Sequence, residues 1–245
     1  MTGAARTGPR AVLPAWSIVR PRLQKDEFRL VTDVGRGAYR LAVFDFDGTL
    51  ADSFPWFLGA VNQAADRYRF RRIEDGDVQM LRGLSARSIV AHLRVPAWKL
   101  PLVARYMRRL AAADIGRITP FDGVLPLLHT LADRGVALAV VTSNSRENVA
   151  TVLGPEIAAR VAFWECGASL FGKARLFRRV VARAGVDPAL ALCIGDEVRD
   201  AEAARAAGVA FGAVTWGYTS ADTLRAQNPA YLFHSVSDIA AAFEG

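Results

Sequence analysis

The stretch Leu41-Ala-Val-Phe-Asp-Phe-Asp-Gly-Thr-Leu50 decides the fold of this chain. It begins as a short apolar run of the kind that forms a strand buried on both faces of a parallel sheet. The run then ends with two carboxylates, Asp45 and Asp47, and burying an unpaired carboxylate is costly. Gly48 allows an unusual backbone turn directly after them. The pattern indicates a strand end that needs a cation, although an isolated Asp-x-Asp fits a helix cap or an Asx-turn equally well.

Short apolar runs alternate with helical segments along the rest of the chain. Further strands are predicted at 136–142, 161–165, 190–194, 210–215 and 231–234. Helices are predicted at 123–133, 146–153, 173–184 and 199–207, several of them ending at a glycine. Continuous apolar strands that alternate with helices predict an α/β fold with a Rossmann-like parallel sheet as its core. Such sheets bind ligands at the carboxyl ends of their strands.

The segment between Leu50 and Pro120 interrupts this alternation. It contains no good buried strand, and helices are predicted instead at 56–68, 77–82, 86–93 and 98–113. We therefore predict a small α-helical cap inserted after the first strand, over residues 53–118. Residues 41–52 and 119–245 would form the core domain. Residues 1–40 would be a basic arm, with a short element of its own around 28–32.

The net charge of +7 is unevenly distributed over the 245 residues. The excess lies in the arm, with eight basic and three acidic side chains, and in residues 66–117, with twelve and five. A basic surface attracts anionic metabolites or nucleic acid, but a solvated face explains it equally simply.

The two cysteines, Cys166 and Cys193, lie in apolar contexts with no spacing that indicates a disulfide framework or a zinc site. Buried, reduced cysteines suit a cytoplasmic protein. No apolar run approaches the roughly 20 residues of a membrane span, so we expect no membrane partner. We expect a monomer or a homodimer.

Polar groups follow three of the later strands, as they do the first. They are Thr142-Ser143-Asn144, Gly172-Lys173 at the start of a helix, and Gly195-Asp-Glu-Val-Arg-Asp200. Parallel strands bring these groups to one edge of the sheet. Phosphoryl transfer needs such a set: a nucleophile, a divalent metal, hydrogen-bond donors and a positive charge around the phosphoryl oxygens.

These four motifs resemble those of the haloacid dehalogenase-like superfamily, in its phosphoglycolate-phosphatase-like branch. The motifs DFDGT, TSN, GK and GDEVRD occur in the family's order and together span residues 41–200. One motif alone would be weak evidence, but four in register are specific. The resemblance implies the family's parallel-sheet core and a cap over the site.

The resemblance also implies a role for each motif residue. Asp45 would be the nucleophile that forms an aspartyl-phosphate, and Asp47 would protonate the leaving oxygen and then deprotonate the attacking water. Lys173 would neutralise the charge on Asp45 and the phosphate. Ser143 would hydrogen-bond the phosphoryl group, with Thr49, Asn144 and, in the cap, Arg87 as further substrate-binding residues. The metal ligands would be Asp45, Asp47 through its backbone carbonyl, Asp196 and Asp200, and the metal would be Mg²⁺.

Each role has a structural alternative. Lys173 could be a surface lysine at a helix start, and Ser143 could be only the N-cap of the helix near Arg146. The resemblance also leaves it open that Asp200 acts through water or pairs with Lys173, and its structural alternative is a surface carboxylate paired with a neighbouring arginine. Arg87 could be an exposed arginine. Glu197 stands where many relatives carry Ser or Thr, which leaves its distance from the metal open.

The sequence thus predicts a Mg²⁺-dependent phosphatase for a small phosphorylated metabolite, such as phosphoglycolate or a sugar phosphate. A phosphomutase shares all four motifs and is the first alternative. A dehalogenase would not need Asp47, because a halide leaves without protonation. A non-catalytic binding protein on the same scaffold would not need all four groups, so nucleic acid is not the expected partner.

Overall fold

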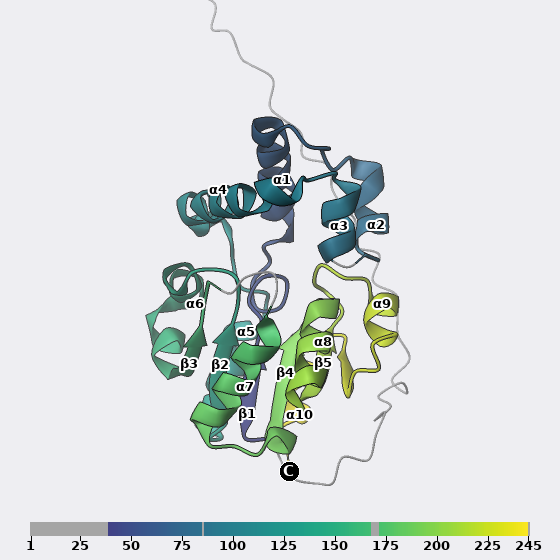
Figure 1. Cartoon of the computed structure of the whole chain (residues 1–245). Coiled ribbons are helices and arrows are strands. Elements are labelled where there is room, and N and C mark those ends of the chain that lie inside the picture. The colour runs from purple at the N-terminus through teal and green to yellow at the C-terminus, as the bar shows by residue number, and fades with distance from the viewer. Residues whose placement is uncertain (1–38, 85, 168–171, 245) are drawn as a thin grey trace, which may run out of the picture.

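Figure 1 shows the computed structural model of the chain, which describes residues 39–84, 86–167 and 172–244. The predicted arm lies almost entirely outside the described residues, and so does the short element expected around 28–32. The described chain begins at Tyr39, which is buried against the rings of Tyr231 and Phe243. The described part of the core therefore begins directly before the first strand.

Within the described residues, a six-stranded parallel sheet forms the centre of the molecule. Its strands are β1 (Leu41–Phe44), β2 (Ala137–Val141), β3 (Val161–Glu165), β4 (Ala191–Gly195), β5 (Ala210–Val214) and β6 (Tyr231–Phe233). The spatial order is β3-β2-β1-β4-β5-β6, and each neighbouring pair is parallel. This arrangement confirms the predicted α/β fold class. Because the strand order reverses between β1 and β4, their carboxyl ends form the crevice where such sheets bind ligands.

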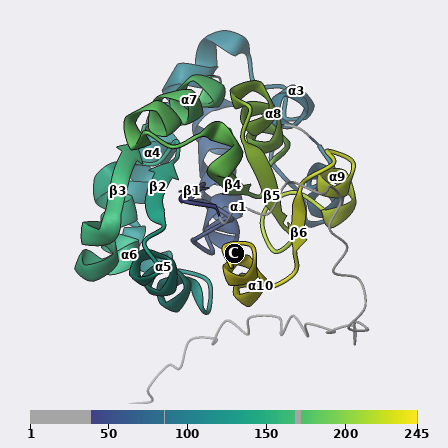
Figure 2. The same ribbon diagram turned by 90° about the horizontal axis from the view of Figure 1, so that it is seen from below.

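Side chains alternate along β1 and divide the core into two layers. Ala42 and Phe44 belong to one cluster of buried residues, and Leu41 and Val43 belong to the other. The first cluster lies under α5 (Val124–Asp133), α6 (Arg146–Arg160) and α10 (Val236–Ala241). The second lies under α7 (Lys173–Ala184), α8 (Val198–Ala207) and α9 (Ala221–Arg225). Figure 2 shows the sheet between α5, α6 and α10 on one side and α7 and α8 on the other.

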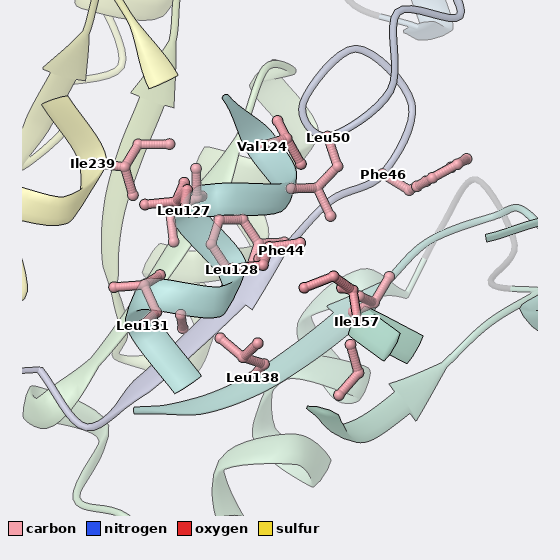
Figure 3. Packing of buried hydrophobic residues seen from close by; sticks show 14 of the residues in the cluster. Phe44, Phe46, Leu50, Val124, Leu127, Leu128, Leu131, Leu138, Ile157 and Ile239 are labelled. Atoms are coloured by element: carbon pink, nitrogen blue, oxygen red, sulfur yellow. The ribbon is translucent and has the colours of Figure 1, made fainter. Parts of the chain in front are cut away.

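Helix α5 shows how the sequence pattern produces this packing. Its buried residues recur at helical spacing: Val124, Leu127, Leu128 and Leu131. Figure 3 shows their side chains gathered with Phe44 and Leu138 of the sheet. Fully burying each leucine contributes about 1.5–3 kcal/mol. The predicted helix at 123–133 is confirmed.

Helix α6 is longer than its prediction, which ended it at residue 153. The helical segment runs to Arg160, with a break at Gly154, whose φ is 78° and ψ is 161°. Pro155 follows the break and opens a second helical piece, because proline is well tolerated in a first turn. The glycine therefore marks a kink rather than the end of the element.

Helices also fill the described part of the insert between β1 and α5. They are α1 (Phe54–Tyr68), α2 (Val78–Leu81), α3 (Ala86–His92) and α4 (Leu100–Ala113). Three-residue 3₁₀ turns lie at Asp75–Asp77, Ala97–Lys99 and Ile115–Arg117, and another precedes β4 at Pro188–Leu190. The insert has a small core of its own, formed by Val61, Ile73, Leu81 and Leu93. Figure 1 shows these helices gathered at one end of the sheet, the end to which β1 leads.

The two chain segments that join the insert to the sheet run side by side. The amide of Asp52 donates to the carbonyl of Thr119 at 2.9 Å, and that of Phe121 donates to the carbonyl of Leu50 at 3.0 Å.

Both cysteines are free, with Cys193 buried in β4 and Cys166 half-buried. Across the ranges that the structure describes, we find no helix with the length and apolar character to cross a bilayer.

Candidate active site

The turn after β1 places both carboxylates of the first motif at the edge of the sheet. Asp45 extends the β1 ladder, and its amide donates to the carbonyl of Ile194 at 2.9 Å. The chain then turns so tightly that Gly48 has a φ of 77°. A Cβ at Gly48 would lie 2.4 Å from Oδ2 of Asp196, so this position needs glycine both for its backbone angle and for space.

Lys173 joins two of these carboxylates. Its ammonium lies 2.9 Å from Oδ2 of Asp45 and 2.5 Å from Oδ1 of Asp200, and all three side chains are buried. Burial by itself lowers the pKa of a lysine, but the Asp200 and Asp45 charges outweigh it and hold the pKa of Lys173 above its ordinary value. The alternatives of a surface lysine and of an Asp200 on the surface are both wrong. Pairing of Asp200 with Lys173, which the sequence left open, is confirmed.

Asp196 follows β4 and is held at both oxygens. Oδ1 accepts from the hydroxyl of Thr49 at 2.8 Å, and Oδ2 accepts from the backbone amide of Tyr218 at 2.7 Å. Burial raises the pKa of Asp196 well above its ordinary value, and the charges of Glu197, Asp45 and Asp200 raise it further. Asp196 is therefore fixed in position, and in the part of the chain that the structure describes its hydrogen-bond partners are neutral.

Three buried carboxylates converge on a position that fits a cation. One oxygen each of Asp45, Asp196 and Asp200 lies within 4.8 Å of the other two. Oδ2 of Asp45 is buried and accepts no hydrogen bond, although it lies beside the Lys173 ammonium. An all-oxygen donor set is the kind that Mg²⁺ prefers. Asp200 is already paired with the Lys173 ammonium, whereas both Asp196 oxygens accept from neutral groups, so the charge of Asp196 is the less compensated of the two.

Asp47 points to a different set of partners. Its carboxylate lies 3.3 Å from Nδ2 of Asn144, whose own Oδ1 accepts from Asn148 Nδ2 at 2.8 Å. Burial raises the pKa of Asp47 from 3.8 to about 6, and the Asp45 charge adds to this effect. Hydrogen bonds from Ser53 and Asn144 offset only part of it. A carboxyl group with this pKa can both donate and accept a proton near neutral pH.

The remaining predicted substrate residues are placed as follows. Ser143 is half-buried and directly precedes Asn144 at the end of β2. It is not the cap of α6, because the Ser145 hydroxyl accepts from the Asn148 amide there. Thr49 is buried, with its hydroxyl bound to Asp196, which makes it a support for that carboxylate. Arg87 lies in the first turn of α3 with an exposed side chain, so its contact with a substrate stays a prediction.

Sequence reasoning missed two groups beside the carboxylates. Tyr218, after β5, holds Asp196 through its amide, and its hydroxyl lies 2.9 Å from that of Ser53. The signal for Tyr218 was its place after a strand at the same sheet edge. Arg199 pairs with Glu197, with Nε 2.6 Å from Oε2, and both side chains are largely covered. The burial of this pair inside the fourth motif had no sequence signal, because charged residues in a first helical turn are usually solvated.

Comparisons with known proteins give a consistent result. The family model for haloacid dehalogenase-like hydrolase matches residues 42–214. A phosphoglycolate phosphatase from Synechococcus elongatus is 33% identical over 198 residues, which cover 80% of this chain and 93% of that protein. One from Caulobacter vibrioides is 34% identical, over 80% and 87% of the two chains. Among solved structures, a haloacid dehalogenase-like hydrolase from Streptococcus pneumoniae superposes with a TM-score of 0.71 at 21% identity, over 84% and 99% of the chains.

Proposed function

The chain belongs to the haloacid dehalogenase-like hydrolases, and from that premise we propose that it is a Mg²⁺-dependent phosphatase acting on a small phosphorylated metabolite. Asp45 forms an aspartyl-phosphate in the course of the reaction. The observation that carries this proposal is the buried triad in which Lys173 joins Asp45 to Asp200, with Asp196 beside it. A scaffold that had lost catalysis would have no reason to keep three costly buried carboxylates and a lysine together.

Asp45 has the contacts that a nucleophile requires. Its Oδ1 accepts from the Phe46 amide at 2.8 Å, which fixes the rotation of the carboxylate. Within the described residues its Oδ2 accepts no hydrogen bond, and the Lys173 ammonium lies 2.9 Å from it. The neighbouring Lys173 ammonium stabilises the negative charge that develops on the phosphoryl oxygens.

Asp47 supplies the protons. With a pKa of about 6, it is partly protonated near neutral pH and can donate to the oxygen of the leaving alcohol. The carboxylate that remains then accepts a proton from the water that attacks the phosphoryl group. Asn144 contacts Asp47 whereas Lys173 contacts Asp45, which gives the proton carrier and the nucleophile separate partners.

Mg²⁺ is proposed to bind Asp45, Asp196 and the backbone carbonyl of Asp47, with Asp200 orienting Lys173. When bound, the cation neutralises charge on the phosphoryl group. Gly48 and Gly217 lie so close to Asp196 that a Cβ at either position would be within 2.5 Å of its side chain. This packing keeps the metal-binding carboxylate in one orientation.

The curated relatives suggest the substrate. Two of them are named phosphoglycolate phosphatase and are more than 30% identical over most of both chains. We therefore propose 2-phosphoglycolate as the first compound to test, within the wider class of small phosphorylated acids and sugar phosphates. The helices of the insert would act as a cap that excludes bulk water, with Arg87 as a partner for the substrate's second anionic group. A cytoplasmic location stays a prediction.

The test is phosphate release from a panel of phosphorylated metabolites, with and without Mg²⁺. The wild type should be active only with the metal, and Asp45→Asn should be inactive because an amide is a poor nucleophile. Asp222→Asn, which changes an exposed carboxylate on α9, is the matched control and should keep full activity. Activity in Asp45→Asn would contradict the mechanism, and silence of the wild type on every substrate would contradict the phosphatase assignment in favour of mutase chemistry.

A further inference from the structure

The loop after β5 contacts both the insert and the carboxylate cluster. We call residues 215–220 the β5 loop. It leaves the sheet next to β4, the strand that carries Asp196 at its end. Figure 1 shows the loop rising from β5 toward α2 and α3 of the insert. The loop therefore connects the insert with the carboxylate cluster.

Arg82, directly after α2, binds the backbone of this loop. Its Nη2 donates to the carbonyl of Gly217 at 2.7 Å, and its Nε donates to that of Tyr218 at 3.3 Å. The carbonyl of Arg82 in turn accepts from the amide of Ser220 at 2.8 Å. The planar fork of a guanidinium suits two neighbouring carbonyls in a way that the single ammonium of lysine does not.

Aromatic rings from α1 close around the same loop. The ring of Tyr218 lies 4.9 Å from that of Phe54 and 5.4 Å from that of Phe57, centroid to centroid. The guanidinium carbon of Arg82 lies 5.6 Å from the Phe54 ring centroid, at cation–π distance. The insert therefore contacts the loop in two ways: the Arg82 guanidinium binds its backbone, and two rings pack against the Tyr218 side chain.

The backbone of the β5 loop also packs against Asp196. The Tyr218 amide donates to Oδ2 of Asp196 at 2.7 Å. A Cβ at Gly217 would lie 2.3 Å from Cβ of Asp196, so the backbone of the loop contacts this side chain without intervening space. Any shift of the loop away from the site removes a hydrogen bond from Asp196 and opens room for its carboxylate to rotate.

We infer that Arg82 is a positioning residue that couples the placement of the insert to the orientation of Asp196, and so to metal affinity. The inference rests on the proposed role of Asp196 as a Mg²⁺ ligand. With Arg82 bound to the loop, Asp196 is preorganised. Without it, the loop and the carboxylate sample other positions, and binding must restore their order. By thermodynamic linkage, Mg²⁺ binding must also favour the state in which Arg82 of the insert is bound to the β5 loop.

The experiment compares the full-length wild type with Arg82→Met, Arg82→Lys and the control Arg105→Met, which alters an exposed arginine on α4. Mg²⁺ affinity is measured by calorimetry without substrate, and amide hydrogen exchange is followed at residues 82–84 and 216–220. Arg82→Met should weaken Mg²⁺ binding by about fivefold or more. Mg²⁺ should slow exchange in both segments of the wild type but not of this variant.

The conservative and control variants sharpen the outcome. Arg82→Lys should fall between the wild type and Arg82→Met, because lysine keeps the charge but cannot bind both carbonyls with one fork. Arg105→Met should match the wild type. If Arg82→Met does not fold, Arg82→Lys carries the comparison. Equal Mg²⁺ affinity in the Arg82 variants and the wild type overturns the coupling alone, whereas a wild type that binds no Mg²⁺ overturns the metal assignment and the coupling with it.

Discussion

At the scale of single residues, the site is defined by uneven charge compensation. The ammonium of Lys173 contacts Asp45 and Asp200, but the contacts of Asp196 come from a hydroxyl and a backbone amide. Asp47 has an amide partner and a hydroxyl partner. Two carboxylates are therefore in contact with the lysine ammonium, while the hydrogen-bond partners of the two others are neutral groups. In the proposed mechanism, this division separates the nucleophile from the group that moves protons.

Asp47 gives a prediction for stability against pH. Burial and the Asp45 charge raise its pKa from 3.8 to about 6, so the folded protein binds this proton more tightly than the unfolded chain. The ionised carboxylate therefore opposes folding above about pH 6, and the cost disappears as the pH falls toward about 4. Asp47→Asn should raise the free energy of unfolding of the metal-free protein by about 1–3 kcal/mol at about pH 8.

Urea denaturation at several pH values measures this effect. The advantage of Asp47→Asn should vanish at about pH 4, where the wild-type carboxyl is protonated in both states. Asp222→Asn, at an exposed position, should follow the wild type throughout. A constant difference between Asp47→Asn and the wild type across the whole pH range would mean that packing, rather than ionisation, separates the two proteins.

The sequence indicated the charged residues of the site, and it named Thr49 and Asn144, which bind two of the carboxylates, but it did not indicate the contact made by Tyr218. Asp45, Lys173, Asp196 and Asp200 could be found because strand ends and helix starts place them at fixed points of a parallel sheet. Tyr218 acts on Asp196 through its backbone amide, which any residue type could supply. No motif can mark such a contact, since the side chain does not make it.

At the scale of elements, the packing of α5 against the sheet can be tested by comparing a buried leucine with a partly buried one. Leu128 is 1% exposed and packs against the sheet, whereas Leu125 on the same helix is only partly buried. Leu128→Ala should lower the free energy of unfolding by about 2–5 kcal/mol, because it removes transfer free energy and leaves a cavity. Leu125→Ala is the matched control and should cost less than half as much. Equal losses in thermal or urea unfolding would contradict the packing described for this helix.

The elements themselves were largely predictable from the sequence. Apolar strands such as Leu41–Phe44 and helices such as Val124–Asp133 show periodic patterns that a single sequence displays directly. The break in α6 was misjudged because glycine followed by proline marks both a helix end and the start of another helix. Helices α9 and α10, of five and six residues, were not predicted, since so short a helix shows little periodicity.

At the scale of the whole molecule, the described core begins at Tyr39, whose ring contacts Tyr231 and Phe243. Deleting residues 1–35 keeps this contact and should leave both the midpoint of thermal unfolding and the rate of hydrolysis close to those of the full chain. Calorimetry and the phosphate-release assay measure the two quantities. Insoluble or inactive protein would show that the arm belongs to the folded core.

The contact between the insert and the β5 loop joins distant parts of the chain. Arg82 and Gly217 are 135 residues apart, and neither belongs to the four motifs that carry the site. Local patterns predicted the helices of the insert, but not which of them contacts the β5 loop. That information arises only when the chain is folded.

The measurement that tests the central claim most directly is chemical trapping of the phosphoryl group during turnover. The protein is quenched with acid while it hydrolyses its best substrate in Mg²⁺, and its peptides are then mapped by mass spectrometry. A phosphoryl group on the peptide containing Asp45, absent from Asp45→Asn, is the predicted result. Phosphate release without any labelled peptide, or labelling that persists in Asp45→Asn, would contradict the assignment of Asp45 as the nucleophile.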